Sequence, residues 1–351
     1  MPPRAATACP GEDAQMRARV GVLAGLALLI LLSGQGCGGV PRPAVAVAHP
    51  AGRPTADSSA ITYAVGTDTL LVTDPAGLTP ARGATPAHHG RSLPTALWFP
   101  TAGAPAASDR AGAVPLPGRF PLVVFAHGFD VTPQYSEVLL HGVAARGYVV
   151  AAPLFPISGA GLPGAAREDD MFRQPGDISA VITELTRRTL QPAGPWSGTL
   201  DPSRVAVAGH SDGAQSVAGM VLYSGLQDRR VSAAVILTGR AFPAPVPVGP
   251  TIPTLVEQGL ADTVSPPERG RGLYDQLHGP KAYLTEPDGT HTSAVLGSAP
   301  ADVDARACIV AFLDTVLRQS VSAGADLTRR AASTGRTGLA INGSLLPRPP
   351  G

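Results

Sequence analysis

The chain has 351 residues, a formal net charge of +1 and only 15% charged residues. Aromatic residues make up 5%, and the sequence has neither a basic run nor a ladder of aromatic residues, which argues against nucleic-acid binding. The length allows one large α/β domain with tails, or two small domains. Three cysteines are too few for a disulfide framework.

The N-terminal segment has the pattern of an export signal. Arg17 and Arg19 precede an apolar run over 20–32, which at about 13 residues is too short to span a bilayer comfortably. Small residues then lead to Cys37 and resemble a bacterial lipobox, although Gly34 stands where such boxes usually carry Leu. We expect a leader over 1–37, starting at Met1 or Met16, with a single anchoring helix as the alternative.

Two mature forms follow from this leader. Either the protein is a cell-envelope lipoprotein anchored through Cys37, or cleavage releases a secreted bacterial protein. In both, membrane contact is confined to the leader or the lipid. The Pro- and Ala-rich segment over 38–60 has no periodicity and is interpreted as a linker.

The expected folded domain covers 61–318. Edge strands are predicted over 61–65 and 69–72, followed by further strands over 93–100, 120–126 and 148–153. Helices are predicted over 135–146 and 178–190, the latter with Asp177 as N-cap. The loop over 154–175, between the last of these strands and the second helix, carries Glu168, Asp169 and Asp170. We interpret these three residues as a solvated surface rather than a metal site.

The most informative stretch covers 204–222. A buried strand of alternating Val and Ala runs into Gly209-His210-Ser211-Asp212-Gly213, and an apolar helical pattern follows. Strand, sharp turn and helix are the context of a nucleophile elbow, which holds Ser211 above the sheet. Gly209 and Gly213 let the strand and the helix pass closely, and the N–H of Asp212 is expected to point at a developing oxyanion.

A second oxyanion donor is predicted after the strand over 120–126. There, His127-Gly128-Phe129 places the N–H of Phe129 opposite the elbow. Two such donors make an oxyanion hole, whereas His127 is expected to brace the turn and to transfer no proton.

Further strands are predicted over 231–237, 254–259 and 281–286, with helices over 269–278 and 302–317 and a disordered tail over 319–351. Cys308 is expected to be a buried apolar residue of the last helix. Alternating strands and helices predict a mostly parallel sheet of about eight strands, with helices on both faces and the active site at the carboxyl ends of the strands.

A serine nucleophile needs a base and an orienting acid, and in this fold the chain order is Ser, acid, His. Asp262 and His291 each follow the end of a predicted strand in this order. The competing histidines are less suitable: His49, His88 and His89 precede the core strands, His141 and His278 lie on helices, and His210 points away from its neighbour. Among the acids, Asp288 is too close in sequence to His291 and Glu257 lies inside a strand.

These motifs resemble the α/β-hydrolase superfamily over residues 61–317. The segments over 97–100, 121–129, 135–153 and 209–213 look like its secreted branch, which includes bacterial cutinases and polyester hydrolases, chlorophyllases and platelet-activating-factor acetylhydrolases. The resemblance implies a triad of Ser211, Asp262 and His291, with Phe129 and Asp212 as oxyanion donors. Two features differ from cutinases: Asp212 follows the Ser where Met is frequent, and Cys308 has no evident partner for a C-terminal disulfide.

We therefore expect a serine esterase that acts through an acyl-enzyme on a small-molecule, lipid or polymer ester. The chemistry requires neither a metal nor an organic cofactor, and we expect a monomer. A peptidase or amidase on the same fold, or a non-catalytic envelope lipoprotein, is the alternative.

Overall fold

The computed structural model describes residues 62–243, 252–333 and 335–346. The expected leader, Cys37 and the linker over 38–60 lie outside the described residues. Within the described ranges, no helix combines the length and the apolar character needed to cross a bilayer.

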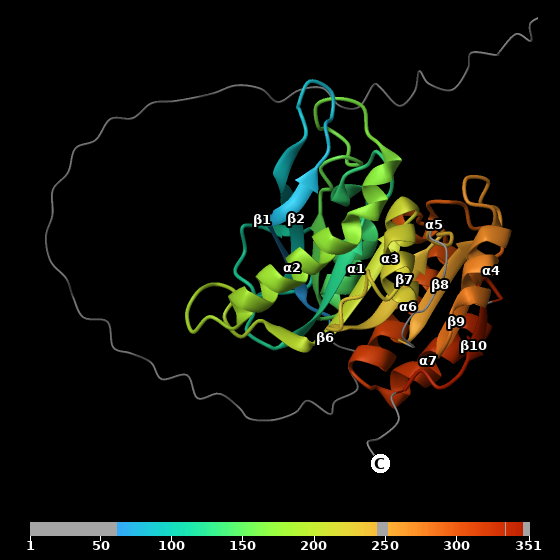
Figure 1. Ribbon diagram of the computed structural model, residues 1–351. Coiled ribbons are helices and arrows are strands. Elements are labelled where there is room, and N and C mark those ends of the chain that lie inside the picture. The colour runs from blue at the N-terminus through green and yellow to red at the C-terminus, as the bar shows by residue number, and fades with distance from the viewer. Residues whose placement is uncertain (1–61, 244–251, 334, 347–351) are drawn as a thin grey trace, which may run out of the picture. The chain divides into compact units, whose positions relative to one another are not determined.

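One sheet organises the described part of the chain, with ten strands in the order β10-β9-β8-β7-β6-β4-β5-β2-β1-β3. The strands are β1 (Ala64–Thr79), β2 (His88–Thr101), β3 (Arg110–Ala111), β4 (Phe120–Ala126), β5 (Val149–Pro153), β6 (Leu200–His210), β7 (Val231–Leu237), β8 (Thr254–Gly259), β9 (Lys281–Glu286) and β10 (Gly338–Asn342). β4 to β9 run parallel, whereas β2 and β10 pair antiparallel with β5 and β9. In Figure 1 the blue β1 and the red β10 lie toward opposite ends of this sheet.

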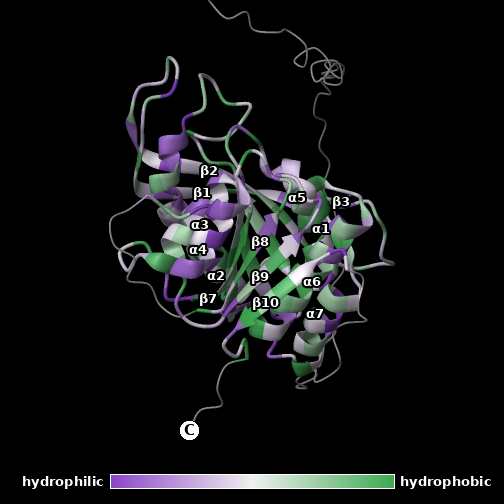
Figure 2. Cartoon of the chain, turned by 90° about the vertical axis from the view of Figure 1, so that its right-hand side faces the viewer, coloured by the Kyte–Doolittle hydropathy of each residue, from purple (hydrophilic) through white to green (hydrophobic). Residues whose placement is uncertain are grey.

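Helices cover both faces of the sheet, as Figure 2 shows with the apolar strands between two helical layers. On one face, α2 (Gln174–Thr189), α3 (Asp212–Leu222) and α4 (Pro267–Gln276) contribute to one apolar core. On the other, α1 (Glu137–Ala145), α5 (Ser293–Leu296), α6 (Pro300–Leu317) and α7 (Val321–Ser333) contribute to a second. Two short 3-10 helices, η2 (Pro133–Ser136) and η3 (Glu168–Phe172), complete the connections near α1 and α2.

The parallel strands are apolar throughout because both of their faces are covered. Every residue of β4, β5 and β8 is buried. Cys308 of α6 is fully buried in the second core, which confirms its predicted place. The expected mixed α/β fold is confirmed, although the sheet has more strands than the eight predicted.

Several predicted elements were wrong in detail. The two expected edge strands form one long strand, β1, because its register with β2 continues across the polar residues between them. Helix α2 starts at Gln174, so Asp177 lies inside it and is no N-cap. Asp170 is fully buried instead of solvated, since it pairs with Arg91.

The expected disordered tail over 319–351 is also corrected, because α7 and β10 occupy much of it. Ala323, Leu327 and Ala331 recur every fourth residue and are buried on one side of α7. β10 then adds to the edge of the sheet by pairing with β9.

Candidate active site

The turn between β6 and α3 holds Ser211 in a strained conformation. Its φ of 56° and ψ of −119° are unusual for a residue with a side chain. The backbone N–H of Ser211 donates to the carbonyl of Leu237 on β7 at 3.1 Å, which fixes the turn against the neighbouring strand. This is the geometry of a nucleophile elbow, as the sequence predicted.

Three glycines allow this turn to pack. A Cβ on Gly209 would collide with the backbone of Gly213, and a Cβ on Gly213 would collide with the carbonyl of Ala126 on β4. A Cβ on Gly128 would lie 3.2 Å from the Cβ of Ser211. Strand, helix and the loop after β4 therefore approach one another more closely than side chains would permit.

A chain of two hydrogen bonds joins the three residues predicted to act together. The hydroxyl of Ser211 lies 2.9 Å from Nε2 of His291, and Nδ1 of His291 lies 2.8 Å from Oδ2 of Asp262. The imidazole side chain is 15% exposed and the carboxylate is fully buried. With Nδ1–H donating to Asp262, Nε2 is the nitrogen that can accept the proton of Ser211.

The loops that carry Asp262 and His291 are fastened to each other at the carboxyl ends of β8 and β9. The N–H of Ala261 donates to the carbonyl of Gly289 at 2.9 Å. Oδ1 of Asp262 accepts the N–H groups of Val264 and Ser265, each at 2.8 Å. The carboxylate is thus oriented by its own loop, with Oδ2 left for the imidazole.

His210 contributes a contact that the sequence did not predict. Its Nε2 donates to the backbone carbonyl of His291 at 2.7 Å, and its ring centroid lies 4.9 Å from that of His291. Burial lowers the pKa of His210 to about 4, so its ring is neutral at ordinary pH. As expected, His210 is not placed to act as the base. It instead holds the loop that carries His291, the residue that can act as the base.

The two predicted oxyanion donors lie at the same cavity. Asp212 is the first residue of α3, and Phe129 follows β4. Both line a cavity of about 440 Å³ together with Ser211 and His291. His127 braces the turn, as predicted: its Nδ1 lies 2.7 Å from the carbonyl of Gly128, and its Nε2 accepts the N–H of Phe155 at 3.1 Å.

Charged side chains surround this cavity. Glu168 of η3, Arg240 after β7 and Arg269 of α4 line it. Burial, followed by the charge of Glu168, raises the pKa of the Asp212 carboxyl, while Arg240 acts in the opposite direction. The wall beside Ser211 is therefore polar as well as apolar.

Behind the loops of Asp262 and His291 lies a group of buried carboxyl groups, Glu257, Glu286 and Asp302. Glu257 and Glu286 are fully buried. Burial raises the pKa of Glu257 well above its usual range and that of Glu286 to about 7, with Asp302 acting in the same direction on Glu286. Burial thus favours the protonated form of Glu257 over the ionised form.

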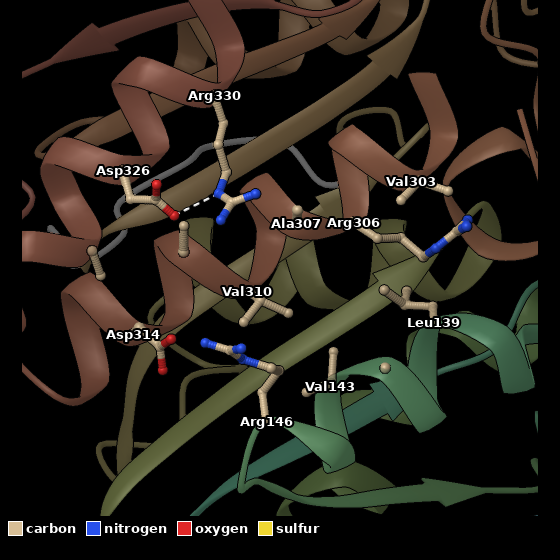
Figure 3. A pocket seen from close by; sticks show the side chains of 13 residues that line it. Leu139, Val143, Arg146, Val303, Arg306, Ala307, Val310, Asp314, Asp326 and Arg330 are labelled. Atoms are coloured by element: carbon tan, nitrogen blue, oxygen red, sulfur yellow. Dashed lines mark hydrogen bonds and ion pairs between the residues drawn. The ribbon is translucent and has the colours of Figure 1, made fainter. Parts of the chain in front are cut away.

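A second cavity, of about 280 Å³, lies between α1, α6 and α7 (Figure 3). Leu139, Val143 and Val310 supply apolar walls, and the ion pair of Arg330 with Asp326 lies at its rim. Its lining includes no serine, histidine or cysteine, so it offers no nucleophile and base of the kind found at Ser211. Among the described residues, no cluster of His, Cys, Asp and Glu has the arrangement of a metal site.

Comparison with known proteins agrees with this architecture. The family model described as chlorophyllase matches residues 113–238, which include Phe129 and Ser211 but neither Asp262 nor His291. Among solved structures, a ferulic acid esterase from Streptomyces cinnamoneus is similar, with a TM-score of 0.59 and 24% sequence identity; the match covers 80% of this chain and 97% of that chain. No curated protein matches the chain. The chain has the α/β-hydrolase fold.

Proposed function

From the α/β-hydrolase fold, we propose that this chain is a serine hydrolase that cleaves carboxylic esters through an acyl-enzyme. The observation that carries the proposal is the pair of hydrogen bonds joining Ser211, His291 and Asp262. The similarity to the chlorophyllase family model and to the ferulic acid esterase supports an ester as the substrate.

In the proposed first step, the hydroxyl of Ser211 attacks the ester carbonyl while Nε2 of His291 takes its proton. The imidazolium then gives this proton to the leaving alcohol. Asp262 accepts from Nδ1–H throughout, which keeps the ring oriented and stabilises its positive charge. Water, activated by the same imidazole, then hydrolyses the acyl-enzyme.

The negative charge on the carbonyl oxygen would be stabilised by the N–H groups of Phe129 and Asp212. Both residues line the cavity of Ser211, and Asp212 starts α3, where the N–H groups have no partner within the helix. Donors fixed in a folded backbone need little reorganisation when the charge develops.

The substitution Ser211→Ala tests this proposal. We expect it to abolish p-nitrophenyl ester hydrolysis and labelling by a fluorophosphonate, whereas Ser224→Ala, at an exposed serine just after α3, should leave both intact. If the unaltered protein shows neither reaction, it is a non-catalytic protein with this fold. If it cleaves peptide or amide substrates and not esters, the peptidase alternative replaces the esterase.

The substrate class is proposed more broadly, as a small-molecule, lipid or polymer ester. Phe129 and Val264 add exposed apolar surface to a cavity that Arg240 and Arg269 make partly polar. A chain-length series of p-nitrophenyl esters, a ferulate ester and emulsified triglyceride would separate these classes.

We also propose that the protein is exported and acts as a monomer in the cell envelope or outside the cell. The support for export is the sequence pattern over 16–37, with a basic start, an apolar run and small residues before Cys37. Mass spectrometry of the mature N-terminus in a bacterial host, with and without Cys37→Ser, distinguishes a lipid-modified form from a cleaved secreted form.

A further inference from the structure

A buried network of polar side chains joins the loop after β4 to α3, outside the residues that the proposed reaction uses. It begins at the loop that carries Phe129. The N–H of Asp130 donates to the carbonyl of Ser158 at 2.9 Å, and the N–H of Phe155 donates to His127 at 3.1 Å. The turn over 155–158 thus holds the loop after β4 by two hydrogen bonds.

The turn itself is held by one carboxylate oxygen. Oδ2 of Asp170 accepts the N–H groups of Ile157 and Ser158, both at 3.1 Å. Asp170 is fully buried, and its other oxygen accepts from Arg91 at 2.8 Å. Arg91 also bonds both oxygens of Asp177, at 2.6 Å each. The carboxylate is therefore fixed on both sides.

The side chain of Gln174 connects this turn to the helix that starts at the elbow. Nε2 of Gln174 donates to Oγ of Ser158 at 3.0 Å, and its Oε1 accepts the hydroxyl of Ser216 at 2.5 Å. Gln174 and Ser216 are fully buried. Ser216 lies on α3 one turn after Asp212, so the amide of Gln174 links the supports of both predicted oxyanion donors.

We propose that Gln174 and Ser216 are positioning residues that set the separation between the N–H of Phe129 and the N–H of Asp212. The inference rests on the proposed function, because only in that reaction do these two N–H groups stabilise an oxyanion. Burying a charged network contributes little net stability compared with apolar packing, but it fixes relative positions through directional bonds. Oxyanion donors need such fixing, because a displacement of about 1 Å can cost about 100-fold in rate.

The test compares Ser216→Ala and Gln174→Leu with Thr315→Val. The control also removes one fully buried helical hydroxyl, which bonds the carbonyl of Ala311 at 2.7 Å in α6, on the other face of the sheet. For each protein, kcat and KM for a p-nitrophenyl ester are measured with the inhibition constant of a trifluoromethyl ketone, whose adduct with Ser211 places an oxyanion in the hole. Thermal unfolding reports stability.

We expect kcat to fall by about 10- to 100-fold in Ser216→Ala while KM changes little, with the inhibition constant rising by a similar factor. The double variant Gln174→Leu/Ser216→Ala should be no slower than Gln174→Leu, because both substitutions break the hydrogen bond between Gln174 and Ser216. Thr315→Val should lose stability only. If Gln174→Leu does not fold, Ser216→Ala decides the matter alone.

Two results would overturn the proposal. In the first, Ser216→Ala loses stability like Thr315→Val but keeps its kcat and its affinity for the ketone, so the network is purely structural. In the second, the unaltered protein has no esterase activity and no fluorophosphonate labelling, which refutes the proposed function and this inference together.

Discussion

The substitution Asp262→Asn has an outcome that the structure determines in detail. Oδ1 of Asp262 accepts two backbone N–H groups, from Val264 and Ser265, at 2.8 Å each, and Oδ2 faces Nδ1 of His291 at 2.8 Å. An asparagine has one oxygen, which must take the place of Oδ1, because two N–H groups cannot face an amide NH2. The NH2 group then faces Nδ1 of His291.

This arrangement forces the wrong tautomer on the imidazole. Nδ1 must accept from the amide, so the proton moves to Nε2, which can no longer take the proton of Ser211. A tautomer error of this kind lowers kcat by about 10⁴-fold, which corresponds to about 5.5 kcal/mol of transition-state stabilisation.

The assay is the kcat for a p-nitrophenyl ester at neutral pH, with Asp262→Ala as the comparison and thermal unfolding as the check on folding. We expect the asparagine variant to fold, because it keeps the hydrogen bonds to Val264 and Ser265. Although asparagine is closer in shape to aspartate than alanine is, we expect its kcat to be no higher than that of the alanine variant. Activity within 10-fold of the unaltered protein would refute the role assigned to Asp262.

Three more predictions concern the surroundings of the site. His210→Phe removes the donor to the carbonyl of His291 and should lower kcat/KM about 5- to 10-fold in steady-state assays, whereas His210→Gln, which keeps an N–H, should lose less. Gly213→Ala forces a Cβ into the carbonyl of Ala126 and should cost about 1–3 kcal/mol in urea unfolding. Glu286→Gln should raise the free energy of unfolding by about 3 kcal/mol at pH 8 and by little near pH 4. The reason is that folding raises the pKa of the Glu286 carboxyl from 4.5 to about 7, so the unaltered protein loses stability as the pH rises between these two values.

Each of these has a contradicting result or a matched control. Equal activity of the Phe and Gln variants of His210 would show that the hydrogen bond does not position the loop. For Gly213→Ala, the matched control is Gly142→Ala in α1, where a Cβ meets nothing within 4 Å and should stabilise the helix by about 0.5–1 kcal/mol. A pH-independent gain in Glu286→Gln would point to packing rather than to the buried proton, with Glu257, Asp302 and Arg306 as the neighbours to substitute next.

The sequence allowed the elbow and its partners to be predicted because they depend on local chemistry and chain order. The strand before Ser211, the glycines around it and the order of Asp262 and His291 are all readable in one dimension. The structure brings the three side chains together by two hydrogen bonds. The parallel core was predictable for the same reason, since strands covered on both faces are apolar along their whole length.

What escaped prediction depends on contacts between distant segments. Arg91 and Asp177 are 86 positions apart in the sequence. The residues around either one give no sign that the two side chains form a buried ion pair. The four-residue spacing of Ala323, Leu327 and Ala331 was available as a signal for α7, although the segment was predicted to be a disordered tail. The contact of His210 with the His291 carbonyl requires knowing where the loop after β9 returns.

The position of β10 has a practical consequence. It pairs with β9 over Lys281–Thr285 and covers backbone N–H and C=O groups that would otherwise be open at the rim. A shortened protein ending before Gly338 would offer those groups to a neighbouring molecule, as a template for intermolecular strand addition. We therefore expect such a truncation to cause precipitation at high concentration before it affects turnover, and an affinity tag replacing those residues to do the same.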